Sequence, residues 1–149
     1  MTIKASTGLR NKLLDTNSMK SIFNLGFLNL YSGPVPSSAD DAIVGGTHLL
    51  LCQISNNNTT TGLTFASAAA NGAITKNLSE TWSKAAANTG TASFYRFVSS
   101  SDTAASSTTE ARVQGSVGTS GADLNLTTTS LVATNVYAID TFSISLPTY

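Results

Sequence analysis

His48 and Cys52 are the residues whose types most readily suggest chemistry, because a thiol beside an imidazole can form a nucleophile and its base. They lie four residues apart in a mostly apolar run, 47–54, that has the composition of a β-strand. At about 3.3 Å per residue their α-carbons are about 13 Å apart, whereas a dyad needs contact at about 3 Å. The spacing predicts that they do not pair, and that they are a core thiol and a half-buried imidazole.

The other signals for catalysis or metal binding are weak. No Gly-x-Ser-x-Gly turn surrounds a serine, and one histidine with one cysteine does not make a zinc site. Asp40 and Asp41 are adjacent carboxylates that we expect to repel each other into solvent, and 40–46 lacks the alternating oxygen ligands of a calcium loop. We predict no catalytic residues, no metal and no cofactor.

Two further patterns have structural explanations. Glu80 and Glu110 could form the acid pair of a glycoside hydrolase only if the fold brought them together, and no sequence feature does so. Gly115, Gly118 and Gly121 lie between two predicted strands, whereas a phosphate-binding loop leads into a helix. We interpret them as turn glycines.

Three aromatic side chains could stack on a sugar if the fold exposed them on one surface. They are Trp82, Tyr31 and Tyr95. Because the large aromatics are spread over several segments, we favour core or subunit contacts for these three. A carbohydrate-binding host-attachment module stays open as an alternative function, and it requires exposed rings.

The composition limits the classes of partner. The 149 residues carry 8 basic and 8 acidic side chains, no net charge, and 43 serines and threonines. A neutral chain without a basic cluster releases few counterions, so we expect neither nucleic acid nor a membrane as a partner. No apolar run approaches the length of a membrane span, and a single cysteine cannot form an internal disulfide. We expect one domain, 1–149, folded in a reducing cytoplasm.

The elements that position these residues begin with a helix. Apolar positions in the first segment share one stripe at about 100° per residue, which predicts an amphipathic helix over 8–24. The stripe consists of Leu9, Leu13, Met19 and Phe23. Thr7 is the expected N-cap and Gly26 the expected stop. We expect the helix to cover one side of a sheet or to dock on a neighbouring subunit.

From residue 27 onward, short alternating runs separated by Gly, Asn, Ser and Pro predict a mainly β fold. We expect 27–149 to form an antiparallel β-sandwich, jelly-roll or immunoglobulin-like. The run 47–54 should be central and covered on both faces, and 92–98 carries apolar bulk on both faces. For 66–92 we favour strands and loops over helices.

One predicted strand, 110–117, has valines on one side and four polar side chains on the other, which predicts a solvated face. The four are Glu110, Arg112, Gln114 and Ser116. The preceding segment, from Ser99 to Thr109, is nearly pure Ser, Thr and Ala with Asp102 as its one charge. We expect it to be a mobile hairpin tip.

Three stretches occur in order along most of the chain: Leu9-Arg-Asn-Lys-Leu-Leu-Asp15, Leu30-Tyr-Ser-Gly-Pro-Val-Pro-Ser-Ser-Ala-Asp40 and Gly115-Ser-Val-Gly-Thr-Ser-Gly-Ala-Asp-Leu-Asn-Leu126. Together they resemble a family of small all-β virion structural proteins of tailed bacteriophages and prophages, and the third stretch is the most distinctive. The resemblance implies a decoration, cement-like or tail-associated protein with no catalytic residues to transfer. The Ser99 to Thr109 segment is longer here than in that family, which puts its outward contacts in doubt.

The resemblance and the neutral, hydroxyl-rich β composition favour a capsid decoration or cement protein of the virion, made in the host cytoplasm. Such a protein would bridge major capsid subunits non-covalently, as a small homo-oligomer, and gain stability from its neighbours. A neck, tail or fibre-attachment component, in contact with other virion proteins, is the alternative within the particle. An enzyme is the hypothesis that the sequence supports least.

Overall fold

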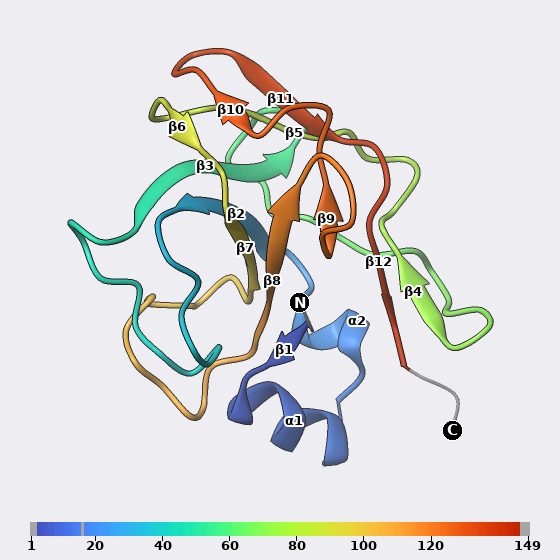
Figure 1. The fold of residues 1–149 in the computed structure, drawn as a ribbon. Coiled ribbons are helices and arrows are strands. Elements are labelled where there is room, and N and C mark those ends of the chain that lie inside the picture. The colour runs from blue at the N-terminus through green and yellow to red at the C-terminus, as the bar shows by residue number, and fades with distance from the viewer. Residues whose placement is uncertain (1–2, 16, 147–149) are drawn as a thin grey trace.

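The computed structural model describes residues 3–15 and 17–146 and shows a mainly β fold with two short helices (Figure 1). All but one of the strand pairings in the described chain are antiparallel, which confirms the predicted fold class. The elements in chain order are β1 (Lys4–Ala5), α1 (Thr7–Leu14), α2 (Met19–Ile22), β2 (Phe27–Ser32), β3 (Leu49–Asn56), β4 (Ala73–Thr75), β5 (Trp82–Ala85), β6 (Gly90–Thr91), β7 (Phe94–Val98), β8 (Arg112–Gly118), β9 (Leu124–Asn125), β10 (Ser130–Leu131), β11 (Val136–Ile139) and β12 (Ser143–Ser145).

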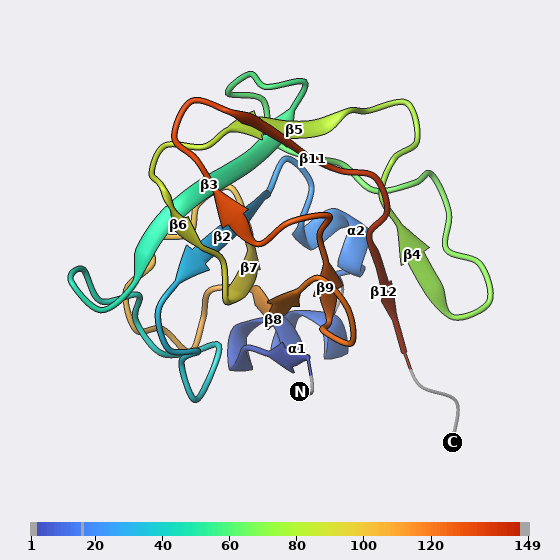
Figure 2. The same cartoon turned by 45° about the horizontal axis from the view of Figure 1, so that its top comes forward.

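An eight-stranded sheet forms the body of the molecule. Its order is β1-β8-β7-β2-β3-β5-β11, and β9 is added to β8 by the parallel pairing. β2 is central, between β7 and β3, with an irregularity in its pairing with β3 between Leu30 and Tyr31. Two ribbons, β10–β6 and β12–β4, complete the fold. The β12–β4 ribbon lies at the edge of the molecule in both views (Figures 1 and 2).

The prediction of one helix over 8–24 is wrong, because the segment forms two helices. The N-cap of α1 is Ser6 rather than Thr7, and its Oγ accepts a hydrogen bond from Leu9 N. A second start follows at Ser18, whose side chain forms a reciprocal capping box at α2. Serine at this position favours a new cap over continuation of a helix, because its hydroxyl competes for backbone N–H groups.

The expected stop at Gly26 is also wrong. α2 ends at Ile22, four residues earlier, and the turn to β2 passes through Leu25 in the left-handed region with φ 58°. Gly26 instead forms an isolated bridge with Leu63. A Cβ at Gly26 would lie 2.3 Å from Val98 O, so the absent side chain allows close backbone packing.

The apolar stripe packs as predicted, although it spans two helices. Leu9 and Phe23 are fully buried, and Leu13 and Met19 pack against the core from partly buried positions. Ser6 joins this segment to the sheet, because its Oγ donates to Glu110 O (2.8 Å) and accepts from Arg112 N (2.9 Å). The interpretation of the helical segment as a cover is confirmed by this packing.

One face of the sheet carries an aromatic core. Phe97 on β7 is fully buried at its centre, with four neighbouring ring centroids 5.1 to 5.8 Å away. The four rings belong to Phe23, Phe65, Trp82 and Phe142. They come from the helical segment, the 57–72 connection, β5 and the residue before β12, so the core joins parts distant in sequence.

The other strand predictions hold with shifted ends. β3 covers Leu49–Asn56 rather than 47–54, and it is buried on both faces at Leu51 and Cys52, while Gln53 is exposed. β7 is buried at all five positions, as expected for apolar bulk on both faces. Residues 66–92 contain β4, β5 and β6 and no helix, which confirms the preference for strands and loops.

Candidate functional site

The face of β8 that the sequence predicts to be solvated is buried instead. Arg112 and Gln114 are fully buried, as is Arg96 on the neighbouring β7. Two loops, 33–48 and 99–111, cover this face and lie together in Figure 1, the first in cyan and the second in light orange. The expectation of a solvated face is wrong because alternation shows which side chains share a face, and these two distant loops cover it.

The segment from Ser99 to Thr109 is part of this cover and not a free hairpin tip. Ile43 N donates to Ala104 O (2.8 Å), and Ser107 N donates to Asp40 O (2.9 Å). These backbone bonds hold the segment against the 33–48 loop, so the prediction of a mobile tip is wrong. Its one charge, on Asp102, points inward toward Arg112.

Arg112 joins both loops to the sheet through its guanidinium. Its Nε donates to Asp102 Oδ1 (2.5 Å), and its Nη2 donates to Ala105 O (2.7 Å) and contacts Glu110 Oε2. Its Nη1 donates to Ala39 O (3.3 Å). Burial raises the pKa of Asp102, against the opposing hydrogen bond from Arg112. The buried charge is thus both paired and hydrogen-bonded, as burial of a charge requires.

Arg96 makes contacts of a different kind, because its direct partners are neutral. Its Nε and Nη2 both donate to Gln114 Oε1 (3.1 and 2.5 Å), and its Nη1 donates to the backbone oxygen of Asp41 (2.9 Å). Gln114 in turn donates to Pro36 O (2.9 Å). Burial, followed by the charge of Arg112, lowers the pKa of Arg96 to about 10, so the guanidinium stays protonated at neutral pH.

A row of polar side chains continues across this face. Strand register places Gln114 beside Arg96, and Arg96 beside Asn29 of β2. Asn29 is buried, and its Nδ2 donates to the Tyr31 hydroxyl (3.3 Å), while its Oδ1 has no partner in the part of the chain that the structure describes. This cluster was not predicted from the sequence, although arginines on two strands of a chain with few charges were a usable signal.

His48 and Cys52 have separate partners, which confirms that they do not pair. The half-buried His48 accepts a hydrogen bond at Nδ1 from Val44 N (2.9 Å) and meets Phe94 edge-on. Cys52 is fully buried, and its Sγ lies 3.5 Å from Lys84 O. Burial raises the pKa of the Cys52 thiol to about 11, which disfavours the reactive thiolate. The structure therefore holds a core thiol and a half-buried imidazole, as predicted.

Asp40 and Asp41 do not extend freely into solvent, so that expectation is wrong. Asp40 accepts hydrogen bonds from the N–H (2.8 Å) and Oγ1 (2.6 Å) of Thr7 in the first turn of α1. Asp41 Oδ2 accepts from Ser37 Oγ and Ser38 N, both at 2.8 Å. These hydrogen bonds lower the pKa of Asp41, and the bond from Ser37 has the largest effect. Both carboxylates stabilise the covering loop.

Glu80 and Glu110 belong to different clusters. Glu80 accepts from Thr64 N and from Trp82 Nε1, each at 2.9 Å, on the core side. Glu110 accepts from Thr103 N (3.0 Å) and contacts Arg112 on the covered polar face. The structure does not bring the two carboxylates together as a glycosidase pair.

The proposed aromatic platform is inside the protein. Trp82 is fully buried, and Tyr95 and Tyr31 are 1% and 4% exposed. The core interpretation of these rings is confirmed, and the sugar-stacking surface built from them is wrong. The interpretation as turn glycines is confirmed for Gly121, which has φ 68° before β9. It is wrong for Gly115 and Gly118, which lie within β8, Gly115 against Tyr95.

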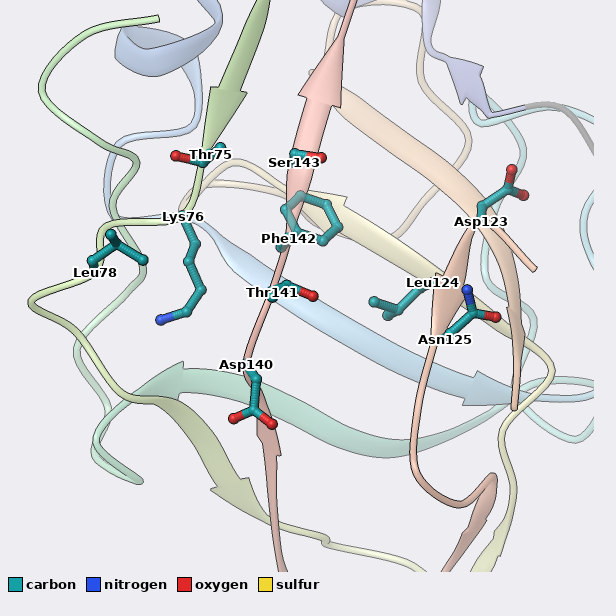
Figure 3. Close-up of a pocket in the computed structure, with 10 residues that line it drawn as sticks. All are labelled: Thr75, Lys76, Leu78, Asp123, Leu124, Asn125, Asp140, Thr141, Phe142 and Ser143. Carbon is teal, nitrogen blue, oxygen red and sulfur yellow. The ribbon is translucent and has the colours of Figure 1, made fainter. Parts of the chain in front are cut away.

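A groove of about 450 Å³ lies between β9 and the segment that leads into β12 (Figure 3). Leu124 and Phe142 contribute its buried apolar side chains. Of its charged residues, Lys76 donates to Glu80 O (2.8 Å), and Asp123 accepts from Ser116 N (2.8 Å). The side chain of Asp140 makes no ion pair within the described chain. Alternation of apolar and polar residues does not show which strands leave a groove between them, so the sequence did not predict this site.

The described residues, 3–15 and 17–146, contain no group of three His, Cys, Asp or Glu side chains placed to hold a metal ion. None of the helices in these ranges is long and apolar enough to cross a membrane. Comparisons with protein-family models, curated proteins and solved structures found no match for the chain.

Proposed function

We propose that this chain is a structural protein of a tailed-phage particle, and specifically a capsid decoration or cement protein that joins major capsid subunits non-covalently. The phage assignment depends on the resemblance of the three sequence stretches. The structural part of the proposal rests on exposed aliphatic side chains at opposite ends of the molecule.

Leu14 at the end of α1 is 86% exposed, and Val136 on β11 is 57% exposed. α1 and β11 lie at opposite ends of the molecule in Figure 1. Burial of a leucine or valine side chain against a neighbour stabilises the contact by about 2 kcal/mol. Two separated apolar contacts suit a protein that bridges two neighbours in a repeated lattice.

The placement of the reactive groups agrees with this proposal. His48, Cys52, Asp40 and Asp41 each make contacts that stabilise the strand or loop on which they lie. The sugar-binding alternative loses its main support, because the aromatic rings it needs are buried in the core.

The first test is the copy number of the chain in purified phage particles, by quantitative mass spectrometry against the major capsid protein. A copy number comparable with that of the major capsid protein supports a shell component. A few to a few dozen copies would move the protein to the neck, tail or fibre attachment. Absence from particles would contradict the virion assignment.

A second test concerns the mechanism. Purified protein is added to shells that lack it, and the melting temperature of the shells is measured. We expect wild-type protein to raise it, and Leu14→Gln to bind about tenfold more weakly through loss of a buried leucine. Asn11→Ser, at an exposed polar position of α1, is the matched control and should bind as wild type does. Equal binding by all three proteins would exclude α1 as a contact.

A further inference from the structure

Two strand edges face each other across the groove without pairing. Residues 123–127 form one side and 138–143 the other, and no backbone hydrogen bond joins the two sides in the described chain. A smaller cavity of about 110 Å³ shares Asn125, Asp140 and Thr141 with the groove. The two cavities are parts of one slot that runs between the strands.

The hydrogen bonds of β12 show which backbone groups face away from its ribbon. Lys76 N donates to Phe142 O (2.9 Å), and Leu146 N donates to Gly72 O (3.0 Å). Residues 142, 144 and 146 therefore face β4. Because the direction alternates along an antiparallel ladder, the N–H and C=O of Ser143 point away from β4, on the side of the slot.

β11 and β9 leave free groups in the same way. Ala86 N donates to Asn135 O (2.9 Å), so alternation directs the backbone groups of Ala138 away from β5. Leu126 N donates to Gly118 O (2.8 Å), which places the N–H and C=O of Asn125 on the side of β9 away from β8. Each side of the slot thus presents backbone donors and acceptors that the sheet does not use.

The dimensions of the slot suit an extended chain. With strands about 4.8 Å apart, a rise of about 3.3 Å per residue and sheets about 10 Å apart, a strand residue occupies about 160 Å³. The groove of about 450 Å³ therefore holds about three residues of an added strand. The smaller cavity allows the strand to continue along β11.

The side chains that line the slot indicate which side chains a bound strand presents to it. Leu124 and Phe142 are 4% and 7% exposed and offer an apolar contact to one inward side chain. Asp140 is exposed and has no ion-pair partner in the described chain, while Lys76 is held by Glu80 O and lies 5.7 Å from the centroid of the Trp82 ring. Lys76, Asp123 and Asp140 together carry one net negative charge, and Asp140 is the exposed member of the three, so the slot complements a cation.

We infer that this slot binds an extended segment of a partner protein as an added β-strand, with an apolar side chain on Leu124 and Phe142 and a lysine or arginine beside Asp140. The backbone of the partner hydrogen-bonds to Ser143, Ala138 and Asn125, as in recognition by strand addition. The inference does not depend on the virion assignment, because it concerns any partner with such a segment.

The test uses the full chain and a displayed library of random heptapeptides. Peptides are selected on wild-type protein and counter-selected on Ser143→Pro, which removes a backbone N–H that the fold does not use. The most enriched peptide is then synthesised with a fluorescent label, and its binding is measured by polarisation. Ser145→Pro is the matched control, since Ser145 also points away from β4 but does not line the groove.

We expect selected peptides to combine a basic residue with an apolar one two positions away. Ser143→Pro should weaken binding about tenfold, Ser145→Pro should not change it, and Asp140→Asn should weaken it and remove its salt dependence. Thermal unfolding checks that each variant is folded. If Ser143→Pro fails to fold, Ala138→Pro replaces it, because the Ala138 N–H also points away from its ladder.

Three results would overturn the inference. The first is a selection that yields no peptide with a preference for wild type over the proline variant. The second is a set of selected peptides that are predominantly acidic. The third is a dimer of this chain, seen by sedimentation, that Ser143→Pro abolishes and Ser145→Pro preserves. That result would make a second copy of the chain the occupant of the slot. None of these results changes the copy number in particles, so a failure here is distinguishable from failure of the virion proposal.

Discussion

On β7, Tyr95 and Phe97 point into the aromatic core, whereas Arg96 points the opposite way, under the loops that cover the second face. The core side is closed by rings from four distant segments, which attract one another without strict direction. The second face is closed by hydrogen bonds from guanidinium and amide groups to loop carbonyls, which depend on direction and distance. The comparison shows that one sheet is buried by two kinds of interaction with different sensitivities to mutation.

Phe97→Ala should produce the largest loss of stability. Removal of a fully buried ring with four aromatic neighbours leaves a cavity and should cost about 4 kcal/mol of unfolding free energy. Urea unfolding followed by circular dichroism measures the loss. Gln53→Ala, at an exposed position of β3, is the control and should change stability by less than about 0.5 kcal/mol. A similar small loss for Phe97→Ala would show that the aromatic face is loosely packed.

Arg112→Met should follow, with a loss of about 3 kcal/mol, because Asp102 stays buried without its cation. Asp102→Asn in the same chain should recover part of the loss, since it removes the unpaired charge. Arg10→Met, on the exposed side of α1, is the matched control and should be nearly neutral. If the double variant is no more stable than Arg112→Met alone, charge pairing is not what holds the loops.

Arg96→Met measures how much an arginine with neutral hydrogen-bond partners contributes to stability, for comparison with Arg112 and its charged partners. It leaves Gln114 Oε1 and Asp41 O without a donor but exposes no unpaired carboxylate, so we expect a loss of about 2 kcal/mol. Urea unfolding of both arginine variants under the same conditions compares their losses of unfolding free energy. A loss larger than that of Arg112→Met would reverse the proposed order of the two arginines.

Asp41→Asn should have the smallest effect and should depend on pH. Hydrogen bonds from Ser37 and Ser38 hold the pKa of Asp41 below its usual value, so ionised Asp41 stabilises the folded state above the pKa of the unfolded chain. That contribution is lost as the pH falls through the folded pKa. Wild type and variant should therefore differ at neutral pH and converge in acid, which melting curves over a pH series measure. A constant difference would contradict this role.

The sequence allowed good prediction of the elements whose signals are local. The apolar stripe from Leu9 to Phe23 packs into the core, and segments with glycine and asparagine separate the strands as expected. The helix break before Ser18 was missed because a stripe shows which residues share a side and is compatible with two helices as well as one. His48 and Cys52 were correctly kept apart because a strand has a fixed rise per residue.

The candidate sites depended on contacts between distant segments and were therefore harder to predict. Arg112 and Gln114 have the alternation of a solvent-facing strand, and the same alternation fits a face covered by loops 33–48 and 99–111. Asp140 lies between β11 and β12 and Ser143 begins β12, and nothing local in the sequence shows which strand edges stay unpaired.

The sequence by itself determined the mainly β class, the apolar positions of the core and the separation of the candidate nucleophile from its base, because these follow from periodicity and chain geometry. Only the tertiary structure decided that the polar face is sealed by two loops and that a slot stays open between β9 and β12. Those outcomes depend on which distant segments meet. The hydrogen bonds that join them leave no periodic signal in the chain, because they span 55 residues from Arg96 to Asp41 and 78 from Gln114 to Pro36.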